Sequence, residues 1–239
     1  MKFLFSENSI DYKNYKFGYS VNLIIDNNDS IENTYCNGFL PYTGNLNDNC
    51  ETYYLARSIR VDLKDYERLS ENKRIIKNVK KKYNIKLKSF DKSEFNHDNI
   101  FFKYCIDFSK ERFSNEILTN DRLSLIISRK NYNKIYVFSI SEIDIGYVLA
   151  YENDNIIHYW FSFYDTKFLS EFPLGKFMME HIVYYAKKNG KKYIFLGTCY
   201  GKKALYKVRD FKGIEFFDGN NWIKDIKNLK KLCKSDSID

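Results

Sequence analysis

Proline, glycine and histidine are scarce in this chain, and long apolar runs are missing. Two Pro and ten Gly among 239 residues exclude collagen-like repeats and argue against long linkers. Five Cys and three His form no C-x-x-C pair and no H-E-x-x-H pattern, so neither a zinc site nor a disulfide framework is indicated. No run approaches the ~18 apolar residues of a transmembrane helix, and Glu7 interrupts any N-terminal signal sequence. We therefore expect a cytoplasmic chain that needs no membrane, no metal and no other cofactor.

The charge balance favours a polyanionic partner. Hydrophobic residues make up 44% and charged residues 29%, which is typical of a folded chain, and the net charge is +8. A lysine surplus also arises from AT-rich codons, however, and only eight of the 39 basic residues are Arg. The arginine positions are therefore the more informative part of this charge.

The first half of the chain alternates short strands and helices. The patterns predict strands over 15–26, 38–44, 52–63 and 85–90, a polar loop over 45–50, and helices over 30–36, 71–83, 96–114 and 119–129. Ser70 is a plausible N-cap of the helix over 71–83, whose polar face carries six basic residues against Glu71. We place a domain boundary near residue 130, which separates residues 1–130 from 131–239.

The second half predicts a more regular arrangement. Three strands over 134–140, 144–152 and 156–164 are followed by a helix from Pro173 to Gly190, which has one apolar stripe that includes His181 as a core residue. The next strand, 191–199, is apolar enough to be a buried parallel strand. This order resembles the core of the acyl-CoA N-acyltransferase (GNAT) fold. We expect an α+β chain, a tandem GNAT-like mixed sheet with flanking helices.

Several short motifs follow one another in a familiar order. They are Gly38-Phe39, Thr43-Gly44, Arg60-Val61-Asp62-Leu63, Lys73-Arg74, Phe163-Tyr164-Asp165, Leu174-Gly175, the strand that ends in Phe195-Leu196-Gly197, and Tyr206-Lys207. Together they resemble the arginyl-tRNA–protein transferases and the related bacterial leucyl-tRNA–protein transferases, over about residues 31–223. The chain departs from that family at Leu40 and Pro41, where the family has two Arg, and at Thr198, where it has Tyr. The family's cysteine cluster is reduced to Cys50, so an iron–sulfur or redox role is not carried over.

The resemblance implies an aminoacyltransferase that moves an amino acid of the Arg or Leu class from its tRNA ester to the α-amine of a protein N-terminus. The amine is itself the nucleophile and the ester is activated, so the enzyme has to orient the reactants and stabilise an oxyanion. No Ser-His-Asp or Cys-His set is required. The implied partners are aminoacyl-tRNA and protein N-termini.

Three groups of candidate residues follow. The catalytic candidates are Tyr206, Lys207 and Gly197; the substrate-binding candidates are Tyr164, Asp165, Gly38 and Phe39; the tRNA-binding candidates are Arg57, Arg60, Lys73 and Arg74. Each group has a structural alternative. Tyr206 could be a packed Tyr beside a solvated Lys207, Gly197 a turn residue, and Asp165 a polar loop residue. The four basic residues could belong to an ordinary solvated helix face. The basic pattern from Trp222 to Lys234 predicts a packed terminal helix, with a membrane or RNA element as its alternative.

Two other functions stay open. An acyl-CoA-dependent N-acyltransferase would carry an R/Q-x-x-G-x-G/A loop before the helix, to hold a pyrophosphate on backbone N–H groups. The corresponding segment here, Phe168–Gly175, contains one Gly and a Pro. The third possibility is a non-catalytic RNA- or protein-binding relative.

Overall fold

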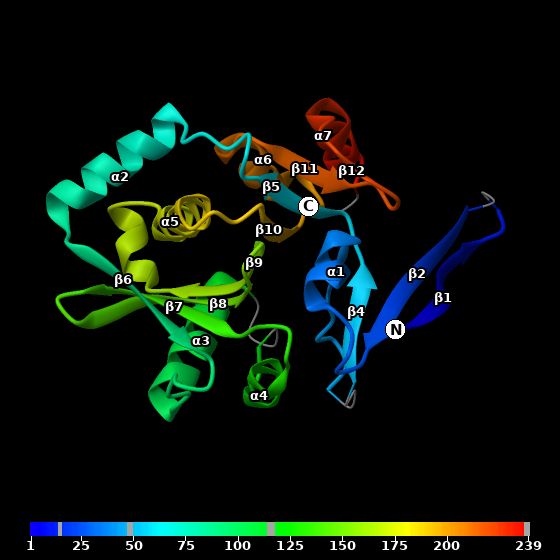
Figure 1. Ribbon diagram of the computed structural model, residues 1–239, viewed down its shortest axis with the longest axis horizontal. Helices are drawn as coiled ribbons and strands as arrows, with labels where there is room; N and C mark the ends of the chain where they lie inside the picture. Colours follow the sequence, from blue (N-terminus) through cyan, green and yellow to red (C-terminus); the bar gives the residue numbers. More distant parts are fainter. Residues whose placement is uncertain (14–15, 47–49, 114–117, 237–239) are drawn as a thin grey trace.

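The strands of this chain are divided between two sheets (Figure 1). The computed structural model describes residues 1–13, 16–46, 50–113 and 118–236; residues 15, 47–49 and 114 of the predicted elements lie outside them. The smaller sheet has the order β1-β2-β4-β3 and the larger has the order β12-β11-β5-β10-β9-β8-β7-β6.

The larger sheet contains β5 (Ser58–Asp62), β6 (Ile85–Asp91), β7 (Lys134–Ile140), β8 (Ile143–Glu152), β9 (Ile156–Tyr164), β10 (Tyr193–Thr198), β11 (Ile214–Phe217) and β12 (Trp222–Ile223). Its flanking helices are α2 (Ser70–Lys82), α3 (Asn99–Arg112), α4 (Asn120–Ser128), α5 (Leu174–Lys188), α6 (Leu205–Asp210) and α7 (Ile226–Ser235), with short 3₁₀ helices η1 (Thr166–Ser170) and η2 (Lys202–Ala204). β7, β8 and β9 are antiparallel neighbours, and β10 returns parallel to β9 after α5. The α+β fold class and its GNAT-like core are therefore confirmed.

The smaller sheet contains β1 (Lys2–Asp11), β2 (Lys16–Ile25), β3 (Phe39–Pro41) and β4 (Glu51–Leu55), and it packs with α1 (Ile31–Cys36). Its apolar face joins the larger sheet through Tyr35, Tyr53 and Phe195, which are fully buried together. Figure 1 shows the β1–β2 hairpin at the end of the molecule opposite α2.

Alternate residues of the central strands face two different helical layers. Tyr136 and Phe138 of β7 belong to the core that includes α5, whereas Ile135 and Val137 belong to the core under α3 and α4. The predicted apolar stripe of α5 is buried, and His181 packs on Phe177 with ring centroids 4.1 Å apart. Burial lowers the pKa of His181 to about 4, as expected of a core histidine.

Two predicted elements were wrong, and one strand was missed. The strand over 52–63 is two strands in different sheets, because the chain turns at Ala56, where Ala56 N–H and the Ser58 hydroxyl both donate to the Gly38 carbonyl. Strand β1 was not predicted, and the terminal helix begins at Ile226 because Trp222 and Ile223 pair with β11. The larger sheet takes β5 and β6 from residues 1–130 and its other strands from 131–239, so it spans the predicted division.

Candidate functional site

The site begins where two parallel strands separate. The pairing of β10 with β9 ends at Phe195 and His158. Immediately beyond, β9 has a bulge: Tyr159 and Phe161 face consecutive residues of β8, which leaves Trp160 without an opposite residue. The pairing of β10 with β5 also shifts register between Phe195 and Thr198. Such irregularities end the ladder and redirect side chains, and they often accompany active sites.

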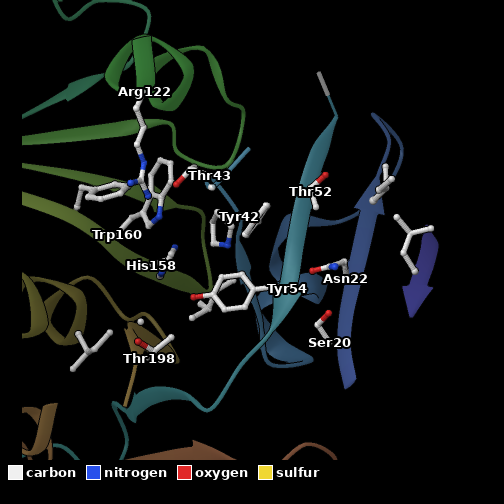
Figure 2. A pocket seen from close by; sticks show the side chains of 18 of the residues that line it. Ser20, Asn22, Tyr42, Thr43, Thr52, Tyr54, Arg122, His158, Trp160 and Thr198 are labelled. Carbon is white, nitrogen blue, oxygen red and sulfur yellow. The ribbon is translucent and has the colours of Figure 1, made fainter. Parts of the chain in front are cut away.

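A cavity of about 950 Å³ occupies the space beside this divergence. It is bounded by one face of the smaller sheet, by β9 and β10, and by single side chains from α4 and α6 (Figure 2). The lining residues on the larger sheet and its helices are Arg122, His158, Trp160, Phe161, Leu196, Gly197, Thr198 and Lys207. Those on the smaller sheet and its loops include Ser20, Asn22, Leu40, Thr43, Thr52 and Tyr54.

Lys207 is held at the floor of the cavity by the backbone of β10. Its Nζ donates to the carbonyl oxygens of Leu196 at 2.8 Å and Thr198 at 3.0 Å. Gly197 lies between these two residues with a φ of +78°, a conformation that L side chains rarely adopt, so the irregular turn of the strand needs glycine. Burial lowers the pKa of Lys207 to about 8.

His158 lies at the last pair of the β9–β10 ladder, and its side chain is 1% exposed. Its ring packs on Tyr35 at a centroid distance of 4.4 Å, and its Nδ1 has no hydrogen-bond partner among the described residues. Burial, together with the charge of Lys207, lowers the pKa of His158 to about 3. The imidazole is therefore neutral at pH 7.

The described lining of the cavity contains no aspartate or glutamate. Its ionisable cations are Lys207 and Arg122, and the remaining polar side-chain groups are hydroxyls, one amide, the Trp160 indole N–H and the neutral His158. Trp160 and Tyr54 supply aromatic surface, and Figure 2 shows Arg122 extending from α4 toward Trp160. This chemistry suits a ligand that has planar rings and carries anionic or carbonyl oxygens.

The structure brings two of the three predicted catalytic residues together. Gly197 and Lys207 line the same cavity, whereas Tyr206 is 39% exposed and is not among its described lining residues. The centre of the Tyr206 ring lies 5.9 Å from Lys207 Nζ.

The predicted substrate-binding residues lie outside the described cavity lining. Tyr164 packs on Phe108 with ring centroids 4.6 Å apart, and the Asp165 carboxylate accepts from Lys167 N–H to cap η1. Gly38 has a φ of +82° and lies against Phe217, and Phe39 is buried in the core of the smaller sheet. The residues that follow them, Leu40 to Gly44, do line the cavity.

The four predicted tRNA-binding residues do not form one patch. Arg60 is 8% exposed, is paired with Glu215 at 2.7 Å, and lies between the rings of Tyr193 and Trp222. Arg57 is paired with Asp236 at 2.8 Å. Lys73 and Arg74 are exposed on α2, together with Lys77, Lys80, Lys81 and Lys82; Arg74 also pairs with Glu71. Only α2 therefore presents these predicted charges to solvent.

Sequence reasoning did not select His158, Trp160, Arg122 or Tyr54 as site residues. The one available signal was a histidine inside the apolar strand pattern of 156–164. Among the described residues, no group of three or more His, Cys, Asp or Glu side chains could hold a metal ion, and no helix has the length and apolar character needed to span a bilayer.

Comparisons with known proteins give a limited picture. No protein-family model and no curated protein matches the sequence. Among solved structures, the C-terminal DUF2156 domain assigned to a lysylphosphatidylglycerol synthetase of Agrobacterium fabrum is 13% identical, with a TM-score of 0.42 over 60% of this chain and 46% of that one. L-PGS of Bacillus licheniformis is 15% identical, with a TM-score of 0.41 over 59% of this chain and 44% of that one. A conserved protein of unknown function from Staphylococcus epidermidis has a TM-score of 0.38 at 11% identity, over 66% of this chain and 57% of that one. This chain thus spans less than half of the first two chains, and its relation to the aminoacyl-tRNA–protein transferases stays a prediction.

Proposed function

We propose that this protein is an N-acyltransferase that moves an amino acid from charged tRNA to a primary amine in the cavity between its two sheets. The observation that carries this proposal is the divergence of β9 and β10 beside Lys207 and His158. It creates a cavity at the end of a parallel pair of strands, where open sheets bind their ligands. More specifically, we propose that the acceptor is the N-terminal α-amine of a protein and that the transferred residue is Arg or Leu.

The chemistry requires little of the protein beyond position and charge. The acceptor amine attacks the ester carbonyl, a C–N bond forms, and the C–O bond to the tRNA ribose breaks. The amine loses a proton, and the ribose oxygen leaves as a hydroxyl. An α-amine has a pKa of about 8, so a useful fraction of it is neutral at pH 7.

Lys207 is our candidate for stabilising the tetrahedral oxyanion. Two of its three N–H donors are taken by the carbonyls of Leu196 and Thr198, which leaves one donor. With a pKa of about 8, it is mostly protonated at pH 7 and can also pass a proton to the leaving ribose oxygen. The neutral His158 lines the same side of the cavity and adds no charge there.

The test is direct transfer with the purified protein. Arg-, Leu- and Lys-charged tRNAs are incubated with peptides whose N-termini are free or acetylated, and the peptide mass is read. We expect one added aminoacyl residue on free N-termini and none on acetylated ones. Transfer that needs a lysine side chain or a lipid amine would retain the acyltransferase and discard the protein N-terminus.

A matched pair of variants links the activity to the cavity. Lys207→Met removes the buried amine while keeping a similar length, and Lys203→Met removes an exposed lysine of η2 that lies outside the described lining. We expect the first to lower transfer ~10²–10³-fold and the second to leave it unchanged. Acetylation of a peptide by acetyl-CoA would favour the acyl-CoA alternative, and binding of tRNA without turnover of either donor would favour the non-catalytic one.

A further inference from the structure

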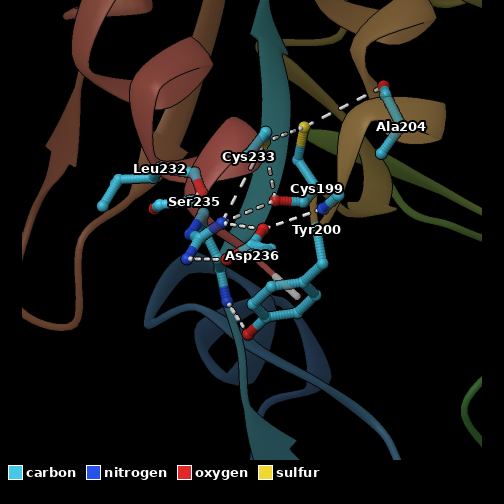
Figure 3. Close-up of polar contacts among 9 residues, drawn as sticks. Cys199, Tyr200, Ala204, Leu232, Cys233, Ser235 and Asp236 are labelled. Atoms are coloured by element: carbon cyan, nitrogen blue, oxygen red, sulfur yellow. Dashed lines mark hydrogen bonds and ion pairs between the residues drawn. The ribbon is translucent and has the colours of Figure 1, made fainter. Parts of the chain in front are cut away.

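Two buried cysteines from distant parts of the chain meet beside the C-terminal helix. Cys199 follows β10 directly, Cys233 lies in α7, and the side chains of both are 0% exposed. Their sulfurs are 3.6 Å apart, although the residues are 34 positions apart in the sequence (Figure 3). The third buried cysteine, Cys105, packs instead in the apolar core under α3.

A set of polar contacts fixes both cysteines in place. Cys233 Sγ lies 3.3 Å from the Cys199 carbonyl oxygen. Arg57 Nη1 lies 4.0 Å from Cys233 Sγ and 2.8 Å from the Asp236 carboxylate, which also accepts from Gly201 N–H. The end of α7 and the turn after β10 are thus held against each other, with the two sulfurs between them, as Figure 3 shows.

We propose that Cys199 and Cys233 form a modification site, at which a hydroperoxide converts the two thiols into a reversible disulfide. A disulfide has sulfurs about 2.05 Å apart, so these sulfurs need to approach by only ~1.5 Å. Neither is needed by the acyl-transfer chemistry, so this proposal does not depend on the proposed function.

The reaction balances without another reactant. The Cys233 thiolate attacks the O–O bond of the peroxide; this sulfur becomes a sulfenic acid, and hydroxide or an alkoxide leaves and takes up the proton that the thiol lost. Cys199 then attacks that sulfur, an S–S bond forms, the S–O bond breaks, and water leaves. The thiols lose two electrons, the peroxide gains two, and the two thiol protons end in the products.

The surroundings assign the order of attack. The Arg57 guanidinium lies beside Cys233 and attracts negative charge on that sulfur. Burial raises the pKa of Cys199 to about 12, which disfavours Cys199 as the first nucleophile. The peroxide reaches the pair through opening of α7, because a ten-residue helix has little stability of its own and buries only Leu229 and Cys233 fully.

The disulfide would tie the terminal helix to the turn that follows the site strand. Cys199 comes directly after Thr198, whose carbonyl holds Lys207. Cross-linking two segments 34 positions apart also limits the unfolded chain, so the oxidised protein is expected to melt at a higher temperature.

The experiment treats the reduced full chain with hydrogen peroxide, alkylates the remaining thiols, and maps peptides without reduction. We expect a cross-linked peptide that contains Cys199 and Cys233 and is released by dithiothreitol. We also expect two fewer alkylated cysteines and a Tm higher by ~5 °C. Cys233→Ser should abolish the cross-link and the Tm increase, whereas Cys36→Ser, which alters a half-buried cysteine elsewhere, should keep both.

Peptide mapping of the unaltered protein decides the matter even if a serine variant folds poorly. Cross-links at other cysteines would overturn the proposal. Sulfinic acid at Cys199 or Cys233 without a cross-link would overturn it too. So would two unmodified thiols at peroxide concentrations that oxidise the exposed Cys50.

Discussion

At the scale of single residues, the titration of Lys207 offers a sharp test of its role. Burial lowers the pKa of this lysine to about 8, so it loses its proton as the pH rises through 8, far below an ordinary lysine. If the ammonium stabilises the oxyanion, transfer should fall above that pH. Below it, transfer should fall as the acceptor α-amine becomes protonated. A bell-shaped rate profile centred near pH 8 is the expected result.

The alkaline limb can be assigned by substitution. Lys207→Arg keeps a positive charge at every accessible pH, so whatever activity it retains should continue to rise above pH 8. Single-turnover rates measured between pH 6 and 10 would show this. An alkaline limb that is unchanged in Lys207→Arg would assign the titration to another group.

Arg60 was predicted to bind tRNA, and its surroundings favour a structural role. Its guanidinium neutralises the buried Glu215 and fills the space between two aromatic rings. Breaking a buried ion pair typically costs about 3–5 kcal/mol, and a second cation on Glu215, Lys224 at 3.6 Å, places the cost here at the lower end of this range. We expect Arg60→Ala to lower the free energy of unfolding by about this amount, as measured by urea denaturation. A variant with unaltered stability and weakened tRNA binding would return Arg60 to the RNA surface.

At the scale of elements, α2 is the part of the predicted RNA surface that stays exposed. We expect replacement of Lys73 and Arg74 by Ala to weaken tRNA binding and to reduce the slope of log K against log[salt] by about two phosphate contacts. Stability should change little, because the Arg74–Glu71 pair is exposed and screened by solvent. Binding measured at several salt concentrations provides the check, and a parental slope would make α2 an ordinary solvated face.

The helices and strands also show how much of the fold the sequence could predict. The strands predicted over 134–140 and 156–164 coincide with β7 and β9, and the helix after Pro173 is α5, because strong apolar periodicity determines these elements locally. The strand over 52–63 failed because each half of it is equally rich in strand-forming residues. The break at Ala56 is made by contacts with Gly38, which lies in the turn between α1 and β3.

The site was less accessible to sequence reasoning than the fold. Gly197 was predicted because it ends a recognisable strand, and Lys207 because the Tyr206-Lys207 pair matches a motif of the resembled family; both line the cavity. Tyr54 and Trp160 could not be found, because they are more than 100 positions apart and meet only through the packing of two sheets. Likewise, no local pattern reports a bulge at Trp160 or that β10 separates from β9 after Phe195.

At the scale of the whole molecule, the cavity joins the two sheets and leads to a test of ligand position. A ligand in it should contact β4 of the smaller sheet and β10 of the larger sheet at once, because both contribute lining residues. The probe is a short RNA hairpin with an amino acid attached to its 3′ end through a stable amide bond. We expect it to slow backbone hydrogen exchange in both strands.

Two tyrosines on opposite faces of the smaller sheet make this prediction specific. Tyr54 lines the cavity, whereas Tyr19 is 63% exposed and lies outside the described lining. An aromatic ring that stacks on a base typically contributes about 1–3 kcal/mol, so Tyr54→Ala should weaken binding of the probe by about tenfold or more. Tyr19→Ala should bind it as the parent does. If both variants bind alike and exchange slows only in α2, the RNA end lies outside this cavity, and the transfer reaction must be sought elsewhere on the molecule.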